Sequence, residues 1–132
     1  MAKRFFLRQS SAEATVADVQ VAHDLKDTLQ AHRATCVGMA ANMIGERKRI
    51  IAVVGDEEEI IVMLNPEIVS TEGAYDAEEG CLSLSGTRET RRFQRIVARW
   101  QDESMVWHEG AFEGRAAQAI QHEVDHCNGV LI

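Results

Sequence analysis

Residues 112–129 read FEGRAAQAIQHEVDHCNG, and this stretch decides how the rest of the chain is interpreted. Apolar residues recur in it every four positions, at Ala116, Ile120 and Val124. This is the spacing of one face of a helix. Asn128-Gly129 supplies the residue types that commonly end a helix. The pattern therefore predicts a helix from about Phe112 to Cys127.

The expected helix contains the pattern His-Glu-x-x-His, at His122, Glu123 and His126. Two histidines four residues apart lie on one face of a helix, so both imidazoles can reach one metal ion. Glu123 lies about 100° around the helix from His122, so its carboxylate can reach a water molecule beside the metal. The alternative is a helix that carries two surface histidines and a glutamate by chance, and the helical context argues against it.

A catalytic metal site of this kind needs a third protein ligand and one open position. In metalloprotease helices of this type the third ligand usually follows the second histidine. Because only six residues follow His126, we expect the third ligand upstream. Many carboxylates are candidates, and so are Cys36, Cys81, His23, His32 and His108. Cys81 stands out because it follows Gly80 in a strand-like run, where the backbone can approach a metal closely. A lone thiol is otherwise more often a small buried apolar group, as we expect for Cys127.

The remaining segments indicate one domain, spanning residues 1–132. Apolar residues from Thr15 to about His32 have helical spacing, with Thr15 and Asp18 as plausible caps. Four strand-like runs follow, at residues 50–54, 60–64, 96–100 and 105–107. The first two flank a polar turn, and we expect Asn65-Pro66 to end the second. The order of elements predicts an α+β domain in which a mixed, mostly antiparallel sheet packs around the His-Glu-x-x-His helix.

Composition limits the class of protein. The chain has 132 residues, 45% apolar and 27% charged, which is typical of a soluble globular domain. Its 21 acidic and 14 basic residues give a net charge of -7, which argues against nucleic acid and anionic membranes as partners. One local group of arginines is interpreted mainly as solvated charge, with a specific anion or carboxylate partner as the alternative: Arg88, Arg91, Arg92, Arg95 and Arg99.

The cellular compartment is also indicated by the sequence. No run approaches the roughly 18 apolar residues of a membrane span, and Met1 to Ser10 lacks the apolar region of a secretory signal. The three cysteines are odd in number and widely spaced, as in proteins of a reducing compartment. We therefore expect a cytoplasmic protein.

Three blocks of the chain resemble the peptide deformylase family. They are CVGMAANMIG at 36–45, EGCLS at 79–83 and QHEVDH at 121–126. In this order they are similar to the family patterns Gly-x-Gly-Leu-Ala-Ala-x-Gln-x-Gly, Glu-Gly-Cys-Leu-Ser and His-Glu-x-x-Asp-His. Residues 64–68 also fit, so the resemblance covers nearly the whole chain. It implies the family's fold and removal of the formyl group from the N-terminal formyl-methionine of nascent proteins.

The resemblance also implies a role for each matching position. The metal ligands would be Cys81, His122 and His126. Glu123 would move protons, and the backbone N–H of Leu82 would bind the oxyanion. The substrate main chain would contact Val37 and Gly38, and Glu79 and Arg92 would form a supporting ion pair. The family binds one divalent metal ion per chain, Fe2+ in the cell with Zn2+ or Ni2+ possible in purified protein. The partner would be a formylated peptide or nascent-chain N-terminus, and the chain a monomer or homodimer.

Two positions depart from the family pattern. Cys36 replaces a glycine, and Met43 replaces a glutamine that resembles an oxyanion-hole donor. Because a thioether has no proton to donate, Met43 predicts slow deformylation unless another donor takes over. Asn42 is the nearest side-chain amide, and we expect it to point elsewhere. Two alternatives to a deformylase stay open: an amidase acting on another N-acylated amine or peptide, and a catalytically silent metal-binding paralogue.

Overall fold

The computed structural model describes residues 10–81 and 84–130, and the side chains among them outside 80–88. Its elements are η1 (Val16–Asp18), α2 (Val19–Ala31), β1 (Gly38–Ala40), η2 (Ala41–Ile44), β2 (Ile50–Val54), β3 (Ile60–Cys81), β4 (Leu84–Gln101), β5 (Trp107–Glu113) and α3 (Gly114–Cys127). The strands form one antiparallel sheet in the order β1-β2-β3-β4-β5. The predicted α+β class is confirmed, and an isolated bridge between Ala12 and Lys48 is parallel.

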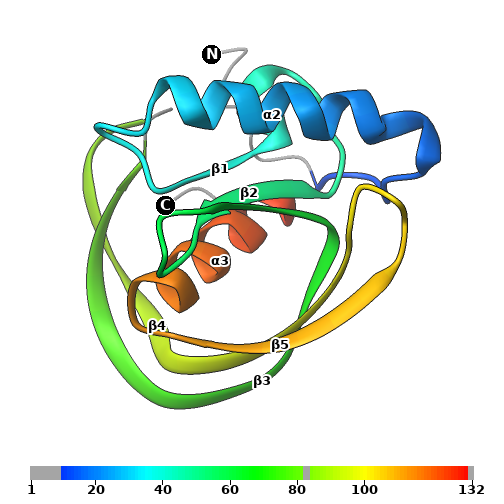
Figure 1. Cartoon of the computed structure of the whole chain (residues 1–132). Coiled ribbons are helices and arrows are strands. Elements are labelled where there is room, and N and C mark those ends of the chain that lie inside the picture. The colour runs from blue at the N-terminus through cyan, green and yellow to red at the C-terminus, as the bar shows by residue number, and fades with distance from the viewer. Residues whose placement is uncertain (1–9, 82–83, 131–132) are drawn as a thin grey trace.

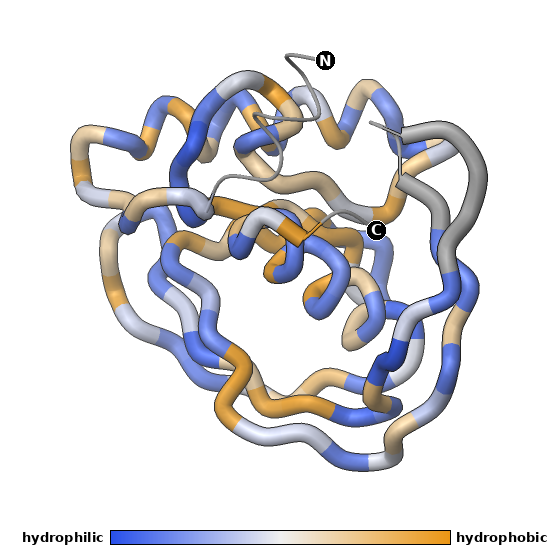
Figure 2. Tube along the Cα trace, turned by 180° about the vertical axis from the view of Figure 1, so that it is seen from behind, coloured by the Kyte–Doolittle hydropathy of each residue, from blue (hydrophilic) through white to orange (hydrophobic). Residues whose placement is uncertain are grey.

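The two long helices lie on opposite sides of the sheet (Figure 1). α2 lies across β1 and β2, whereas β3, β4 and β5 bend around α3. The view from behind shows α3 inside the same curve (Figure 2). The helix that carries the His-Glu-x-x-His motif is therefore enclosed by strands from both halves of the sheet.

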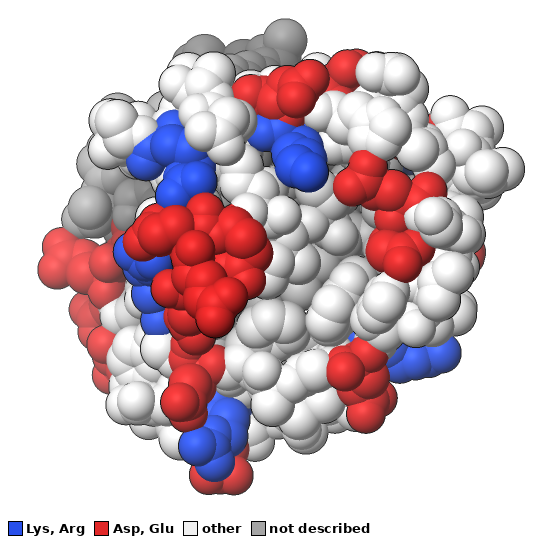
Figure 3. Space-filling model, in the orientation of Figure 1, with Lys and Arg blue, Asp and Glu red and all other residues white. Residues whose placement is uncertain are grey.

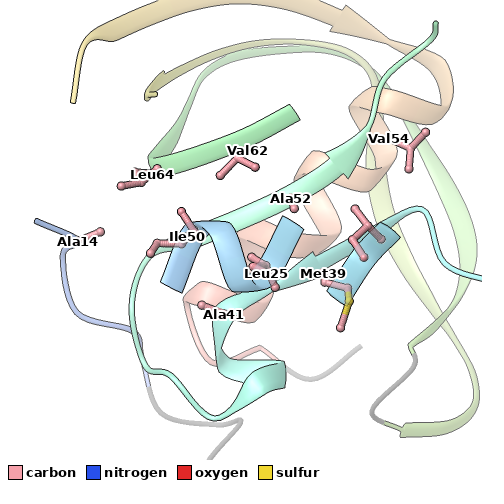
Figure 4. Close-up of a cluster of buried hydrophobic side chains, with 11 residues drawn as sticks. Ala14, Leu25, Met39, Ala41, Ile50, Ala52, Val54, Val62 and Leu64 are labelled. Atoms are coloured by element: carbon pink, nitrogen blue, oxygen red, sulfur yellow. The ribbon is translucent and has the colours of Figure 1, made fainter. Parts of the chain in front are cut away.

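β2 is buried on both faces, so its alternate residues enter two different cores. The residues that pack on the α2 side are Ile50, Ala52 and Val54 (Figure 4). The residues that pack on the α3 side are Ile51 and Val53. Successive side chains of a strand point to opposite faces, which explains this division. A continuous apolar run in β2 is what allows one sheet to separate two helices.

Of the two predicted caps, Thr15 caps η1, whereas Asp18, which precedes α2, makes no side-chain capping bond to that helix. The Thr15 side chain accepts a hydrogen bond from the Ala17 N–H at 3.3 Å, and the Asp18 carboxylate accepts one from the Thr15 N–H at 2.9 Å. This reciprocal pair satisfies backbone donors at the helix start. The buried face of α2 consists of Ala22, Leu25 and Leu29. Among the helices of the described residues, none has both the length and the apolar character needed to cross a membrane.

The expected end of the second strand is wrong. β3 continues through Asn65-Pro66 to Cys81, with a shift of pairing register between Leu64 and Glu67. Asn65 has a φ of 52°, so the irregularity begins at this residue. Proline cannot donate a hydrogen bond to a neighbouring strand and is tolerated at such irregularities. Pairing with β4 resumes beyond it, so the proline interrupts the ladder without ending the strand.

Further boundaries differ from those expected, and the strand predicted at 96–100 is longer: β4 runs from Leu84 to Gln101. The last strand begins at Trp107, not at Met105, because Met105 has a φ of 63° and belongs to the preceding turn. It then extends to Glu113, so α3 begins at Gly114 instead of near Phe112. The predicted helix end is confirmed: Gly129 has a φ of 77° and its N–H donates to the His126 oxygen at 3.0 Å.

The charged side chains are unevenly distributed on the face drawn in Figure 3. Its largest charged patch is acidic, and an uncharged area lies beside it. Basic side chains are scattered on this face and do not form a broad area. The distribution on this face agrees with the net charge of -7.

Candidate metal centre

His122 and His126 lie side by side in the interior of the molecule. His122 is 8% exposed and His126 is 0% exposed, and their Nε2 atoms are 3.1 Å apart. The rings meet edge to face, with centroids separated by 4.8 Å. One helical turn separates the two residues, which places both rings on the same face of α3. The arrangement agrees with the spacing seen in the sequence.

The donor atoms of the two histidines fit one divalent metal ion. Two nitrogens that bind one metal at 2.0–2.1 Å in tetrahedral geometry are about 3.3 Å apart. The observed separation of the Nε2 atoms is 3.1 Å. Imidazole nitrogen suits zinc, iron and nickel, so the chemistry of the donor set fits as well.

Glu79 contacts the ring nitrogen of His122 that does not face His126. This nitrogen, Nδ1, lies 2.8 Å from Glu79 Oε1, and the same carboxylate accepts hydrogen bonds from Arg92 Nη2 at 2.7 Å and Gln118 Nε2 at 2.8 Å. Burial raises the pKa of Glu79, but hydrogen bonds from His122, Arg92 and Gln118 and the charge of Arg92 together lower it to about 2. The ionised carboxylate therefore favours a proton on Nδ1, which leaves the Nε2 lone pair for a metal.

Arg92 joins Glu79 to Asp125 and is 4% exposed. Its Nη1 lies 2.7 Å from Asp125 Oδ2, while Nε and Nη2 bind Glu79. A buried guanidinium is tolerated when carboxylates pair with it on two sides. The interpretation of this arginine as solvated charge is wrong, and the ion pair with Glu79 that the resemblance implied is present.

The other arginines of that group behave differently from Arg92. Arg91, Arg95 and Arg99 have exposed side chains that pair with surface carboxylates of neighbouring strands. Their expected solvated character is confirmed. The side chain of Arg88 lies outside the part of the chain that the structure describes.

Glu123 lies on α3 directly beside β1. It is 4% exposed, and a Cβ atom placed on Gly38 would be 3.1 Å from both Cγ and Oε2 of Glu123. This distance is shorter than ordinary van der Waals contact, so glycine is the residue that permits the close approach. Gly38 itself is buried, whereas the neighbouring Val37 is 43% exposed. The fold thus brings a buried carboxylate, the two histidines and the edge strand together.

η2 contains Met43, which replaces the family's glutamine donor, and Asn42, the nearest side-chain amide. Met43 packs against both hydrophobic cores, and its Sδ accepts a hydrogen bond from the Ala40 N–H at 3.3 Å. Asn42 points into the protein, where its Nδ2 donates to the backbone oxygen of His126 at 2.8 Å. The expectation that Asn42 points elsewhere is confirmed.

The cysteines occupy different environments. Cys81 ends β3, but its side chain lies outside the described part of the chain, and so does the whole of Leu82. Cys36 directs its Sγ to the Gly38 oxygen at 2.9 Å. Cys127 is 0% exposed, and burial raises the pKa of its thiol to about 12. Cys127 is therefore a core residue, as predicted.

Two other candidate ligands are engaged elsewhere. His23 pairs with Glu103 at 2.5 Å, and His108 pairs with Asp102 at 2.7 Å. Both histidines have side chains that are about half exposed, at 50% and 46%. These surface pairs connect α2 and β5 with the turn between β4 and β5.

The sequence reasoning missed Gln118 and the contact of Asp125. Gln118 lies four residues before His122, so the helical spacing alone could have placed it on the histidine face. Asp125 contacts Arg92 across 33 residues of sequence, a pairing that depends on how β4 packs against α3. No local pattern in the sequence predicts that contact.

Comparison with known proteins agrees with this arrangement. Residues 3–132 match the sequence pattern of the family described as polypeptide deformylase. A peptide deformylase of Clostridium beijerinckii is 47% identical over 128 residues, which is 96% of this chain and 93% of the relative. One from Thermodesulfovibrio yellowstonii is 39% identical over 106 residues, or 76% of this chain and 64% of the relative.

Solved structures of peptide deformylases have the same fold. The crystal structure from Legionella pneumophila superimposes with a TM-score of 0.84 at 37% identity, over 96% of this chain and 77% of that one. A class I type b enzyme from Acinetobacter baumannii, bound to Met-Ala-Ser, has a TM-score of 0.84 at 28% identity, over 96% and 90%. The match of sequence and fold over nearly the whole chain shows that this protein belongs to the peptide deformylase family.

Proposed function

We propose that this chain hydrolyses the formyl amide at the N-terminal methionine of nascent proteins and uses one divalent metal ion. The observation that carries the proposal is the pair of buried histidines with Nε2 atoms 3.1 Å apart. Beside them lies a carboxylate that is 4% exposed, Glu123. The bond cut is a formamide, not a peptide bond, and the activity is assigned to the cytoplasm, where such chains are made.

Three residues would hold the metal: Cys81, His122 and His126. A divalent metal in that position lowers the pKa of water to about 7 and polarises a carbonyl oxygen. Imidazole suits iron, zinc and nickel, so the donor set is compatible both with Fe2+ in the cell and with Zn2+ or Ni2+ in purified protein. Glu79 fixes the tautomer and orientation of His122, and Arg92 and Gln118 fix Glu79.

Glu123 would move the protons of the reaction. It takes a proton from the water that attacks the formyl carbon and gives it to the amine nitrogen that leaves. Its burial beside Gly38 excludes bulk water from this transfer. The backbone N–H of Leu82 would donate to the oxyanion that develops on the formyl oxygen.

The peptide would bind along β1. This strand is an edge of the sheet, so one side of its backbone can pair with an extended chain. Val37 and Gly38 would supply these main-chain contacts. The similar Acinetobacter baumannii enzyme was crystallised with bound Met-Ala-Ser, which supports a peptide substrate of this kind.

The test is an anaerobic assay of iron-loaded protein on formyl-Met-Ala-Ser and acetyl-Met-Ala-Ser, with metal content measured in the same sample. We expect hydrolysis of the formyl peptide and little of the acetyl peptide. The Glu123→Gln protein, which keeps the size of the side chain but not its basicity, is the matched control. Fully metallated protein that cleaves neither peptide, or that prefers the acetyl peptide, would contradict the proposal.

A further inference from the structure

Asn42 connects η2 to the last turn of α3. Its Nδ2 donates to the backbone oxygen of His126 at 2.8 Å, although 84 residues separate the two in sequence. The last carbonyls of a helix lack partners within the helix and need others. The His126 oxygen also accepts from the Gly129 N–H at 3.0 Å, but that bond is local and moves with the helix end. The contact from Asn42 instead ties the helix end to a different element.

The other half of this amide has an unusual environment. Asn42 is 3% exposed, and among the described residues its Oδ1 is buried without a hydrogen-bond partner. The amide cannot be reversed to relieve this, because Oδ1 would then face the carbonyl oxygen of His126. A buried acceptor without a partner costs free energy, and an apolar side chain of similar size would avoid the cost. Packing alone therefore does not account for asparagine at this position.

We propose that Asn42 is a positioning residue that sets where His126 presents its ring nitrogen to the metal. The inference rests on the proposed function, because it takes His126 as a ligand. The backbone of His126 is fixed by the Asn42 contact, and its ring is 4.8 Å from that of His122. Ligand geometry must be held within about 0.5 Å for tight metal binding, so a small shift of the last helical turn is sufficient to weaken it.

The experiment measures Zn2+ affinity by competition with a chelator, and the stability of the metal-free protein by urea unfolding. In Asn42→Leu we expect Zn2+ affinity to fall about tenfold, as is typical when a group supporting a ligand is lost. The metal-free variant should be about as stable as wild type, because removal of the unpaired oxygen offsets the lost hydrogen bond to the His126 oxygen, which keeps its bond from the Gly129 N–H. A loss of Zn2+ affinity without a loss of stability distinguishes positioning from a general structural role. The Co2+-substituted variant should also show altered ligand-field absorption bands.

Asn65 provides a matched control. It is 7% exposed, and its Nδ2 donates to the Ala14 oxygen at 2.9 Å and to Gln101 Oε1 at 2.7 Å. Asn42→Asp and Asn65→Asp both replace an amide donor by a carboxylate in a buried site. We expect both to lose stability but only Asn42→Asp to lose Zn2+ affinity. If Asn42→Leu does not fold, the Zn2+ affinity of Asn42→Asp, compared with that of Asn65→Asp, tests the proposal instead.

The proposal on Asn42 and the proposed function fail in different ways. Loss of a group that supports a ligand typically changes metal affinity by about 10-fold or more. A folded Asn42 variant whose Zn2+ affinity is within about threefold of wild type, and whose Co2+ absorption bands are unchanged, would therefore overturn the positioning role. The proposed function would be unaffected by that result. An equal loss of affinity in Asn65→Asp would also overturn the positioning role. Wild-type protein that binds no metal would refute the proposed function itself.

Discussion

α2 and α3 pack on opposite faces of the same strands, but the residues that they bury differ in kind. The buried residues of α2 are Ala22, Leu25 and Leu29. α3 buries apolar residues too, and in addition Gln121, His122, Glu123 and His126. Burial of apolar surface stabilises a fold, whereas burial of ionisable groups is unfavourable unless partners surround them. Both sides therefore have a hydrophobic core that stabilises the fold, but the α3 side also contains the buried polar groups on which the proposed chemistry depends.

The sharpest test of the α3 side is Glu123→Gln. We expect this protein to keep its metal and to lose turnover by roughly 10² to 10⁴, because the amide cannot accept the proton. Turnover of formyl-Met-Ala-Ser and metal content are measured on the same sample. A fully metallated variant that keeps more than about a tenth of the wild-type rate would exclude Glu123 as the proton carrier.

The corresponding test of the α2 side is Leu25→Ala. Leu25 is 0% exposed within the core of Figure 4, so its truncation should lower the free energy of unfolding by about 2–5 kcal/mol. The turnover of the folded fraction should stay near that of wild type. Urea unfolding gives the first quantity and the formyl peptide assay the second. Leu25→Met, which conserves volume, is the control and should cost less than about 1.5 kcal/mol. A large loss of turnover with little loss of stability in Leu25→Ala would contradict this separation of the α2 side from the chemistry.

Glu79→Gln tests whether the buried charges of the α3 side are stabilised by their partners. The folded-state pKa of Glu79 is about 2, below its usual value of 4.5. A lowered folded-state pKa means that ionised Glu79 contributes stability above about pH 4.5 and that this contribution is lost as pH falls toward 2. We therefore expect the stability difference between metal-free wild type and Glu79→Gln to be largest near neutral pH. It should shrink below pH 4.5.

Urea unfolding between pH 7 and pH 3 in the presence of a chelator measures this difference. The control is Glu113→Gln, which removes one member of a surface ion pair with Arg95, 66% and 58% exposed respectively. Water and salt screen such exposed pairs, so the control should change little. A difference for Glu79 that does not depend on pH would show that its charge is not what stabilises the site.

The same contrast explains what the sequence could and could not predict. Local periodicity was sufficient for α2, for the β2–β3 hairpin and for the histidine face of α3, because neighbours in sequence decide these features. It failed at Asn65-Pro66, where pairing with β4 carries the strand past a residue that breaks the local pattern. It also failed for Arg92, since the burial of its guanidinium depends on partners 13 and 33 residues away.

The smallest expected effect concerns Met43, which lies where the two cores meet. Its sulfur accepts the Ala40 N–H but cannot donate to an oxyanion, and Asn42 directs its amide nitrogen to His126 instead. In Met43→Gln, the amide oxygen could accept the Ala40 N–H while the amide nitrogen donates to the oxyanion. Loss of one such donor typically costs about 10² to 10³ in turnover, so we expect its return to raise turnover at least several-fold, with a smaller change in KM. Anaerobic kinetics on formyl-Met-Ala-Ser with fully metallated protein measure both turnover and KM. Met43→Leu, which adds no donor, is the control and should show no gain in turnover. Equal or lower turnover in folded Met43→Gln would mean that the metal and the Leu82 N–H already complete the oxyanion site.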